Sequence, residues 1–533
     1  MKKSLPFLCA AAILAISGLV GCKPAGAKDT DQTLEIYAWN GGYGVEWVDA
    51  IIDEFKAQAW VQEKYPELEV LTPVTNDVYS FANSKLSMGT RNTIDVMFTP
   101  GARDHFGPGG SLLDLTEVVY NKEVPGENVL YKDKSEDSYN VSNRYTDPKD
   151  SRKISYYCTA WAGGMNGIIY NETILNSLGI KVPNTTDELI QACATIMSYK
   201  DNKEGKYSKG ISFMQSYDAA YVDALFPQWW AQYEGQQAFT NFYSGIDNNR
   251  YSKNIFNQKG REYSLEVIEA LMDYDSGYLA PETWRYEYMQ GQLLFLQGNG
   301  VFHANGDWFD NEMRELASGI KNMDTFKTMK TPILSELGTK LGITDSELSS
   351  IIDYIDGNRT DLINFESTTG YLDEEVVEEI TAARGIVHSI GPNHQAVIPS
   401  HSTAKDVAVD FLRFMATDIA LEAYARATGG NTLPFDYDIK EKAPELYESF
   451  APVQQSRIDY VSTDRYAINV LPSENGFPLY VYGNVKPFIN VNFFETFAKS
   501  GNVKTPADFM QETKDYWTDE RWSRALRDAG LTL

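Results

Sequence analysis

The chain has 533 residues, of which 43% are hydrophobic and 13% aromatic, so it can bury a sizeable core and is long enough for two domains. Its formal net charge is −27, and it lacks the clusters of lysine and arginine that phosphate binding needs, which excludes nucleic acid as a partner. Beyond the N-terminus, no segment is apolar enough to cross a membrane.

The N-terminus has the pattern of a secretory signal. Two lysines at positions 2 and 3 precede an apolar stretch over residues 5–20, which is too short to span a bilayer comfortably. The stretch ends in LVGC, which resembles the lipobox of bacterial lipoproteins, where cleavage before the cysteine is followed by lipidation of its thiol. We therefore predict a signal peptide over 1–21, lipidation at Cys22 and a tether over 22–32. The mature protein is then expected outside the cytoplasm, anchored to the bacterial cell membrane by its lipid.

Strands and helices alternate along the rest of the chain. Apolar residues at every second position predict strands, and apolar residues at helical spacing predict amphipathic helices. The predicted strands are TLEIYAW (33–39), IDVMFT (94–99), GIIYN (167–171) and QAVIPS (395–400), and the predicted helices lie over 45–55, 185–199 and 402–417. Thr185 and Glu188 form a capping box at the start of the second helix. This alternation favours an α/β protein with largely parallel sheets.

The segment FLQGNGVFHANGDWFDNEM (295–313) has three glycines around a short apolar run. It predicts a helix, a turn, a buried strand and a second turn. An indole at the end of a core strand, here Trp308, either packs in the core or faces a ligand.

Residues 335–384 read as an insertion. They contain a second capping box, formed by Thr344 and Glu347, and an acidic helix that begins near Asp373.

The familiar catalytic signatures are missing from the sequence. It contains no G-x-S-x-G elbow, no H-E-x-x-H, no C-x-x-C, no Walker A loop and no G-x-G-x-x-G. Two of the five scattered histidines, His394 and His401, straddle a strand, but no third metal ligand stands out. We therefore expect no catalytic residue, no metal and no cofactor. The 74 acidic residues leave paired carboxylates for glycoside hydrolysis open, although no pair is singled out.

After loss of the signal peptide, Cys158 and Cys193 are the remaining cysteines. They could form one disulfide, but we expect two buried free thiols.

Aromatic residues lie beside glycines or at predicted strand ends. In open α/β sheets, ligands bind at the carboxyl ends of the strands. Sugars offer C–H faces for stacking on indoles and hydroxyls for hydrogen bonds to polar side chains, so this pattern suits a carbohydrate pocket. The stretches concerned are Trp39-Asn40-Gly41-Gly42-Tyr43, Trp161-Ala162-Gly163-Gly164, Trp229-Trp230 and Gly306-Asp307-Trp308.

With these residues in view, the chain resembles the extracellular solute-binding proteins of carbohydrate ABC importers, the broad family that includes maltose-binding protein. The resemblance runs over most of the mature chain, and its segments occur in the family's order. They are IYAWNGGYGVEWVDAIIDEF (36–55), the helix, strand and loop over 83–119, the stretch 159–193 that begins TAWAGGMNGIIYN, FLQGNGVFHANGDWFDNE (295–312) and the late helices over 397–435.

The resemblance implies a two-lobed α/β fold of the periplasmic-binding-protein type II class, with a mainly parallel sheet in each lobe and crossover strands between them. We expect residues 33–162 and 333–430 in the N-terminal lobe, with the insertion 335–384, and residues 163–332 and 431–533 in the C-terminal lobe. It further implies a monomer that closes on its ligand by a hinge and presents it to the permease subunits of the importer.

The resemblance also implies roles for single residues. Trp308 becomes a stacking platform in the interlobe cleft, and Asn40 and Tyr43 match the family's ligand-facing first loop. Arg103 and Asp104 match a charged pair that binds sugar hydroxyls in relatives. The full expected binding set is Trp39, Asn40, Tyr43, Arg103, Asp104, Trp161, Trp229, Trp230, His303, Asn305, Trp308 and Asn431.

Two alternatives share these features. A surface-anchored carbohydrate-active enzyme would have the export signal and the aromatic residues, together with a catalytic acid pair. A binding protein for a peptide or another polar solute would have the same fold, with more backbone hydrogen bonds and less stacking.

Overall fold

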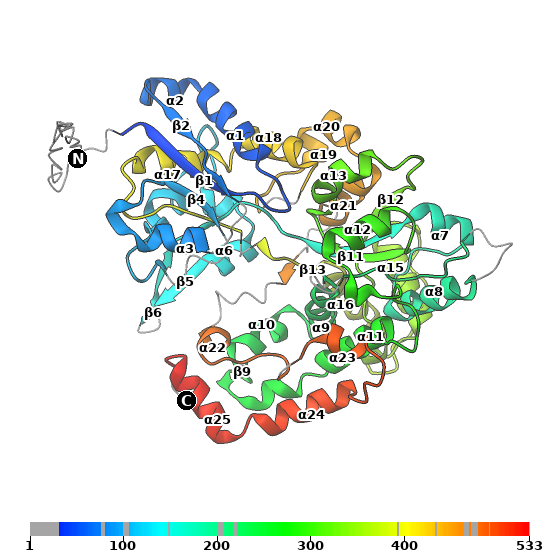
Figure 1. Cartoon of the computed structure of the whole chain (residues 1–533). Helices are drawn as coiled ribbons and strands as arrows, with labels where there is room; N and C mark the ends of the chain where they lie inside the picture. The colour runs from blue at the N-terminus through cyan, green and yellow to red at the C-terminus, as the bar shows by residue number, and fades with distance from the viewer. Residues whose placement is uncertain are drawn as a thin grey trace, which may run out of the picture.

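The structure, a computed structural model, describes residues 31–75, 80–99, 106–147, 150–200, 207–216, 221–391, 394–431, 434–462, 468–470, 478–489 and 491–531. Cys22, Arg103 and Asp104 lie outside these ranges. The chain forms two lobes, each containing a sheet flanked by helices (Figure 1). Within the described ranges, no helix combines the length and the hydrophobicity needed to cross a bilayer.

The first lobe is built on a six-stranded sheet in the order β2-β1-β4-β14-β7, with β3 also paired to β1. Strand β1 runs parallel to β2, β3 and β4, whereas β14 is antiparallel to β4 and β7. The strands are β1 (Thr33–Trp39), β2 (Glu69–Leu71), β3 (Val74–Thr75), β4 (Val96–Thr99), β7 (Thr159–Ala160) and β14 (Gln395–Val397).

Alternating side chains of these strands bury the two faces of the sheet. Ile36 and Phe98 pack with the apolar faces of α1, α17 and α18, while Tyr37 and Met97 pack on the opposite face with side chains of α3. The helices of this lobe are α1 (Glu46–Ala57), α2 (Ala59–Lys64), α3 (Ser80–Ser87), α5 (Tyr131–Lys134), α6 (Asp137–Asn143), α17 (Lys405–Phe414) and α18 (Asp418–Thr428), with the single turns η1 (Gly89–Arg91) and η2 (Thr116–Tyr120) and the hairpin of β5 (Arg144–Asp147) and β6 (Asp150–Tyr156).

The second lobe has a three-stranded sheet in the order β11-β8-β12, formed by β8 (Asn166–Asn171), β11 (Phe302–Gly306) and β12 (Phe326–Met329). Both pairings are antiparallel, so the expectation of a mainly parallel sheet holds for the first lobe and is wrong for these strands. The reason is that hydrophobic periodicity shows which residues are buried but not in which direction a strand runs.

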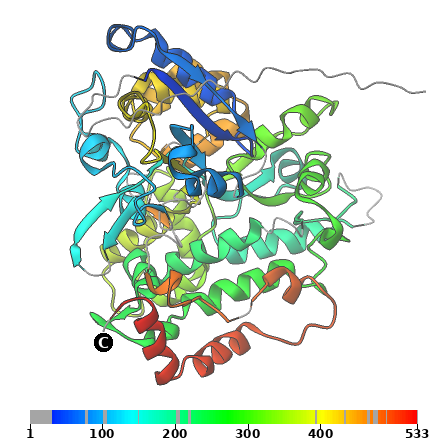
Figure 2. The ribbon, with the colours of Figure 1, turned by 60° about the vertical axis from the view of Figure 1, so that its left-hand side comes forward.

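Helices make up most of the second lobe. Their largest core lies between α9 and α11, and the C-terminal helices α24 and α25 run along the outside of this pair (Figures 1 and 2). The elements are α7 (Glu172–Leu178), α8 (Thr186–Ser198), η3 (Tyr221–Ala224), α9 (Leu225–Glu234), α10 (Gln236–Ser244), β9 (Ile246–Asp247), β10 (Arg250–Tyr251), η4 (Lys253–Asn257), α11 (Gly260–Met272), η5 (Thr283–Arg285), α12 (Tyr288–Leu296), α13 (Phe309–Ser318), α21 (Pro452–Ser462), α22 (Pro478–Val481), α23 (Phe493–Phe497), α24 (Pro506–Tyr516) and α25 (Asp519–Asp528).

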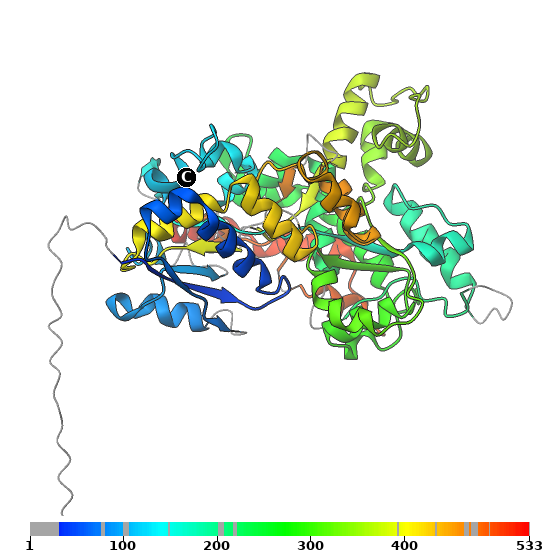
Figure 3. The same cartoon turned by 90° about the horizontal axis from the view of Figure 1, so that it is seen from above.

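The insertion forms a helical unit with its own small core, made by α14 (Glu336–Leu341), α15 (Asp345–Ile355) and α16 (Asp373–Arg384). It projects from the second lobe (Figure 3) and is joined to it by hydrogen bonds from Asn184 to Asp353, 2.8 Å, and from Thr185 to Asp345, 3.0 Å. These contacts correct the expected assignment of residues 335–384 to the N-terminal lobe. Nothing in the local pattern of an insertion shows which neighbour its helices pack on.

The local signals are confirmed in part. Thr344 and Glu347 form the predicted capping box, and α16 begins at Asp373. Thr185 caps α8 as predicted, but the Glu188 carboxylate accepts from the Asn184 N–H, one residue before the cap. Cys158 and Cys193 are buried free thiols, as expected.

The chain passes between the lobes more than once, and two of the passages lie side by side. Residues 161–165 connect β7 to β8, and residues 389–394 connect β13 (Ile386–His388) to β14. The Ile390 N–H donates to the Gly164 carbonyl at 2.8 Å, and Met165 and Ser389 form a bridge. A third passage, after α18, contains α19 (Ile439–Lys442) and α20 (Pro444–Ser449), and β13 pairs with β15 (Ile468–Val470).

Candidate functional site

One edge of the first-lobe sheet brings polar and aromatic residues together. Gln395 pairs with both Thr99 and Ala160, so the carboxyl ends of β4 and β7 meet the start of β14. The loop after β1 reaches the same edge, because β1 and β4 are parallel neighbours. Thr99, Trp161, His394 and Tyr43 therefore lie where open α/β sheets bind their ligands.

The rings at this edge form a compact cluster. Tyr43 makes edge-on contacts with Trp161, His394 and Trp308, at centroid distances of 5.5, 5.1 and 6.1 Å. Behind them, Trp161 stacks on Trp47 at 4.8 Å. We call the cluster of Tyr43, Trp161, His394 and Trp308, with Asp307, the lobe junction, because Asp307 and Trp308 follow β11 of the second lobe and the others belong to the first lobe or to a passage.

The two lobes are in direct contact at the lobe junction. The Tyr43 hydroxyl of the first lobe donates to Asp307 Oδ1 of the second at 2.6 Å, while the Trp308 indole N–H donates to the Tyr221 hydroxyl within the second lobe at 3.3 Å. A Cβ on Gly42 would come within 2.8 Å of Trp308 Cβ, so the close approach of loop and helix requires glycine there. Trp308 is consequently only 6% exposed in this arrangement.

Several buried polar atoms near the lobe junction have no hydrogen-bond partner in the described structure. They include Trp161 Nε1, His394 Nδ1 and Thr99 Oγ1 at the sheet edge, both amide atoms of Asn431 and the Tyr424 hydroxyl. Buried polar groups are almost always paired, so these atoms are candidates for hydrogen bonds to a ligand.

The electrostatics of the junction follow from burial. Burial lowers the pKa of His394 to about 3, so its ring is neutral and offers one donor and one acceptor. Burial and the neighbouring Asp307 carboxylate raise the pKa of Tyr43 well above its ordinary value, which keeps the hydroxyl a donor. The junction therefore supplies flat rings and neutral hydrogen-bonding groups, which suits binding of a polar, uncharged molecule better than acid–base chemistry.

Arg457, from α21, ties the third passage to the second lobe. Its guanidinium donates to the carbonyls of Asp307, 3.0 Å, and Gly429, 2.8 Å, and forms an ion pair with Asp310. Beside it lies a small pocket lined by residues that include Asn305, Asp307 and Arg457. No group of three or more His, Cys, Asp or Glu residues within the described ranges is arranged to hold a metal ion.

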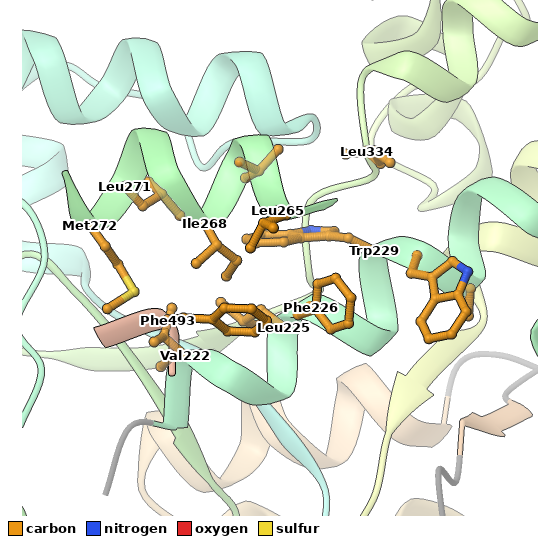
Figure 4. Close-up of a cluster of buried hydrophobic side chains, with 14 of the residues drawn as sticks. Val222, Leu225, Phe226, Trp229, Leu265, Ile268, Leu271, Met272, Leu334 and Phe493 are labelled. Atoms are coloured by element: carbon orange, nitrogen blue, oxygen red, sulfur yellow. The ribbon is translucent and has the colours of Figure 1, made fainter. Parts of the chain in front are cut away.

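The structure gives Trp229 and Trp230 a different position from the one expected. Both are fully buried in the second-lobe core, Trp229 among side chains of α9 and α11 (Figure 4), and their indole N–H groups donate to Pro332 O and Gln258 Oε1. They do not line a cleft here, because the aromatic side chains of α9 pack against α10 and α11. We therefore remove them from the expected binding set.

His303 and Asn305 are also engaged within the protein. The two ring nitrogens of His303 contact Met214 O, 2.7 Å, and Asn305 Nδ2, 2.9 Å, while Asn305 Oδ1 accepts from the Gly306 N–H. Both ring nitrogens of His303 are used, whereas Asn305 keeps one amide N–H and lines the pocket beside Arg457. At the end of β1, Trp39 is half-buried and Asn40 is exposed, so both remain candidates.

Two residues of the junction, His394 and Asp307, are absent from the expected binding set, as is Tyr221, which contacts the junction through Trp308. The sequence around His394 indicates an ordinary hydrogen-bonded histidine, and only the sheet register shows that its ring lies beside Tyr43 and Trp161. Tyr221 is far from Trp308 in the sequence, and no local signal connects them. Asp307, by contrast, could have been found from its place directly before Trp308.

Comparisons with known proteins agree with this fold. Residues 41–326 match the family model described as bacterial extracellular solute-binding protein. No curated protein sequence matches the chain significantly.

Solved structures match over nearly the whole chain, at low sequence identity. One, from work on xylan utilisation by the thermophilic bacterium Caldanaerobius polysaccharolyticus, has a TM-score of 0.56 at 15% identity and covers 91% of this chain and 100% of its own. An ABC substrate-binding protein from Listeria monocytogenes in complex with cycloalternan has a TM-score of 0.55 at 13% identity, covering 94% and 100%. A chitin oligosaccharide binding protein has a TM-score of 0.54 at 13% identity, covering 92% and 99%.

Proposed function

Because this chain belongs to the family of bacterial extracellular solute-binding proteins, we propose that it captures a carbohydrate between its two lobes and delivers it to the permease of an ABC importer. In this role no bond of the ligand is made or broken. Binding selects the closed arrangement of the lobes, and the permease recognises that arrangement.

The observation that carries the proposal is the unpaired hydrogen-bonding capacity among the rings of the lobe junction. Trp161 Nε1, His394 Nδ1 and the Asn431 amide are buried without partners in the described structure, and Tyr43 contacts the Trp161, His394 and Trp308 rings. A sugar ring would supply hydroxyls to these atoms and a C–H face to the indole. One solved protein of the same fold is in complex with cycloalternan and another is a chitin oligosaccharide binding protein, which supports the same class of ligand.

We further propose an oligosaccharide rather than a single sugar, because the candidate residues come from several segments, among them the end of β1 at Trp39, the residue after β7 at Trp161 and the segment after β11 at Trp308. We also propose that Cys22 carries a lipid after removal of residues 1–21, that residues 22–32 tether the folded protein to the membrane, and that the protein acts as a monomer. Arg103 and Asp104 remain proposed ligand contacts from the first lobe.

A thermal-shift screen against a panel of oligosaccharides tests the proposal, since a ligand that binds the folded state raises its melting temperature by mass action. The variant Trp161→Phe keeps a flat ring but removes the unpaired indole N–H. Loss of one hydrogen bond of about 0.5–1.5 kcal/mol should weaken binding by roughly two- to tenfold. The matched control is Trp229→Phe, which should lower stability and leave affinity unchanged. If no carbohydrate raises the melting temperature, the proposed ligand class is wrong.

Small-angle scattering tests the conformational part of the proposal. Two lobes that close on a ligand should become more compact when the oligosaccharide is added. A tight ligand that leaves the radius of gyration unchanged would contradict closure while leaving the ligand assignment intact.

A further inference from the structure

Glu312 faces the first lobe one turn after Trp308 on α13. The Glu312 N–H donates to the Trp308 carbonyl at 3.0 Å, so the two side chains lie on one side of the helix. A Cβ on Gly42 would come within 3.0 Å of Glu312 Oε1, which places this carboxylate oxygen directly against the loop after β1. The other oxygen, Oε2, accepts from Gln292 Nε2 at 2.7 Å. One carboxylate oxygen is therefore held and the other points across the lobe contact.

The surroundings of Glu312 offer acceptors. Gln292 and Gln215 are both fully buried, and the Oε1 atom of each has no partner in the described structure. The two amides lie on neighbouring segments, because a Cβ on Gly291 would come within 3.1 Å of the Ser216 side chain and 3.5 Å of Gln215 O. The two amide oxygens and the Glu312 carboxylate are acceptors, so a ligand group that reaches them has to be a hydrogen-bond donor.

Negative charge on this side is not compensated by the cations that the structure describes there. Arg457 is committed to Asp310 and to two backbone carbonyls. Burial raises the pKa of Glu312 to about 7, although the Gln292 hydrogen bond acts in the opposite direction.

We propose that Glu312 selects the charge of the ligand: it accepts a hydrogen bond from a hydroxyl or ammonium group of the sugar and rejects a sugar that carries a carboxylate at that position. The ligand class is thus a neutral or amine-bearing oligosaccharide, and not a uronate. The physical basis is that a second carboxylate beside Glu312 would be repelled at short range in surroundings of low dielectric constant. This inference rests on the proposed carbohydrate function.

The test uses the folded mature protein and three matched sets of oligosaccharides with the same linkages: neutral, amine-bearing and uronate. At pH 8.5, where a carboxyl with a pKa of about 7 is ionised, wild-type protein should bind the neutral or amine-bearing form at least about tenfold more tightly than its uronate counterpart, given the size of a like-charge contact. Glu312→Gln keeps the acceptor for Gln292 and should reduce that ratio to within about threefold. Glu315→Gln, an exposed acid on the same helix, is the control and should keep the full ratio.

Each outcome either supports the role of Glu312 in charge selection or overturns it. Wild-type binding of a uronate as tight as that of its neutral counterpart would overturn the inference, as would a Glu312→Gln variant that discriminates like wild type. Thermal melting of both variants shows whether a change in binding comes from misfolding, because a variant that folds poorly has a lower melting temperature. If none of the three sets binds, the proposed function fails first and the inference fails with it.

Discussion

Replacing Trp308 with alanine tests whether the lobe junction binds a ligand or only packs. The indole is 6% exposed and contacts Tyr43 of the first lobe and Tyr221 of the second. A buried indole covers roughly 150–250 Å², so at about 25 cal/mol per Å² its loss costs about 4–6 kcal/mol, shared between the lobe contact and packing within the second lobe. If a sugar ring also stacks on the indole, binding loses about 1–3 kcal/mol, which is roughly a ten- to hundredfold drop in affinity.

The assay combines calorimetric titration and thermal melting on the same sample. Trp230→Ala is the control, because Trp230 is wholly buried in the second-lobe core and its removal leaves a cavity worth about 3–5 kcal/mol. We expect Trp308→Ala to lower both affinity and melting temperature, and Trp230→Ala to lower the melting temperature alone. A Trp308→Ala variant with a reduced melting temperature and intact affinity would refute the assignment of Trp308 to the binding site.

Three further predictions concern stability and location. Burial holds three histidines neutral, so the stability they contribute is present above their unfolded pKa of about 6.5. It is lost as the pH falls towards 4, by up to about 3 kcal/mol each. Denaturant unfolding between pH 7.5 and 4.5 should show this loss, and a free energy of unfolding that does not change with pH would contradict it. The lowered pKa values are about 4 for His303, about 4 for His388 and about 3 for His394. Arg384→Ala leaves the buried Asp356 carboxylate without its main partner and should destabilise the insertion by about 3–5 kcal/mol, seen as faster hydrogen exchange confined to residues 335–384, whereas unchanged exchange there would show the pair to be dispensable. Cys22→Ala should move the protein from the membrane fraction to the soluble fraction or leave it unprocessed, and unchanged membrane retention would point to a different anchor.

Local patterns in the sequence were enough to locate β1, α1, β4, β8, β11 and α17, because the spacing of apolar residues within each segment shows that it is a strand or a helix. They also showed that Trp308 follows a core strand and that Cys158 and Cys193 are buried thiols. The capping box at Thr344 belongs to the same class, since its two hydrogen bonds join residues three apart.

Features that depend on contacts between distant segments could be established only from the tertiary structure. An aromatic residue is compatible both with a core and with a cleft, so only packing showed that Trp229 and Trp230 are enclosed by α10 and α11 while Trp308 meets the first lobe. The antiparallel order of β8, β11 and β12 depends on the path of the long helical segments between them. The position of His394 beside Tyr43 results from pairing between β14 and β4, strands that are far apart in the sequence. The sequence of one helix or strand shows which of its faces is buried, whereas the segment that packs on that face depends on the whole fold.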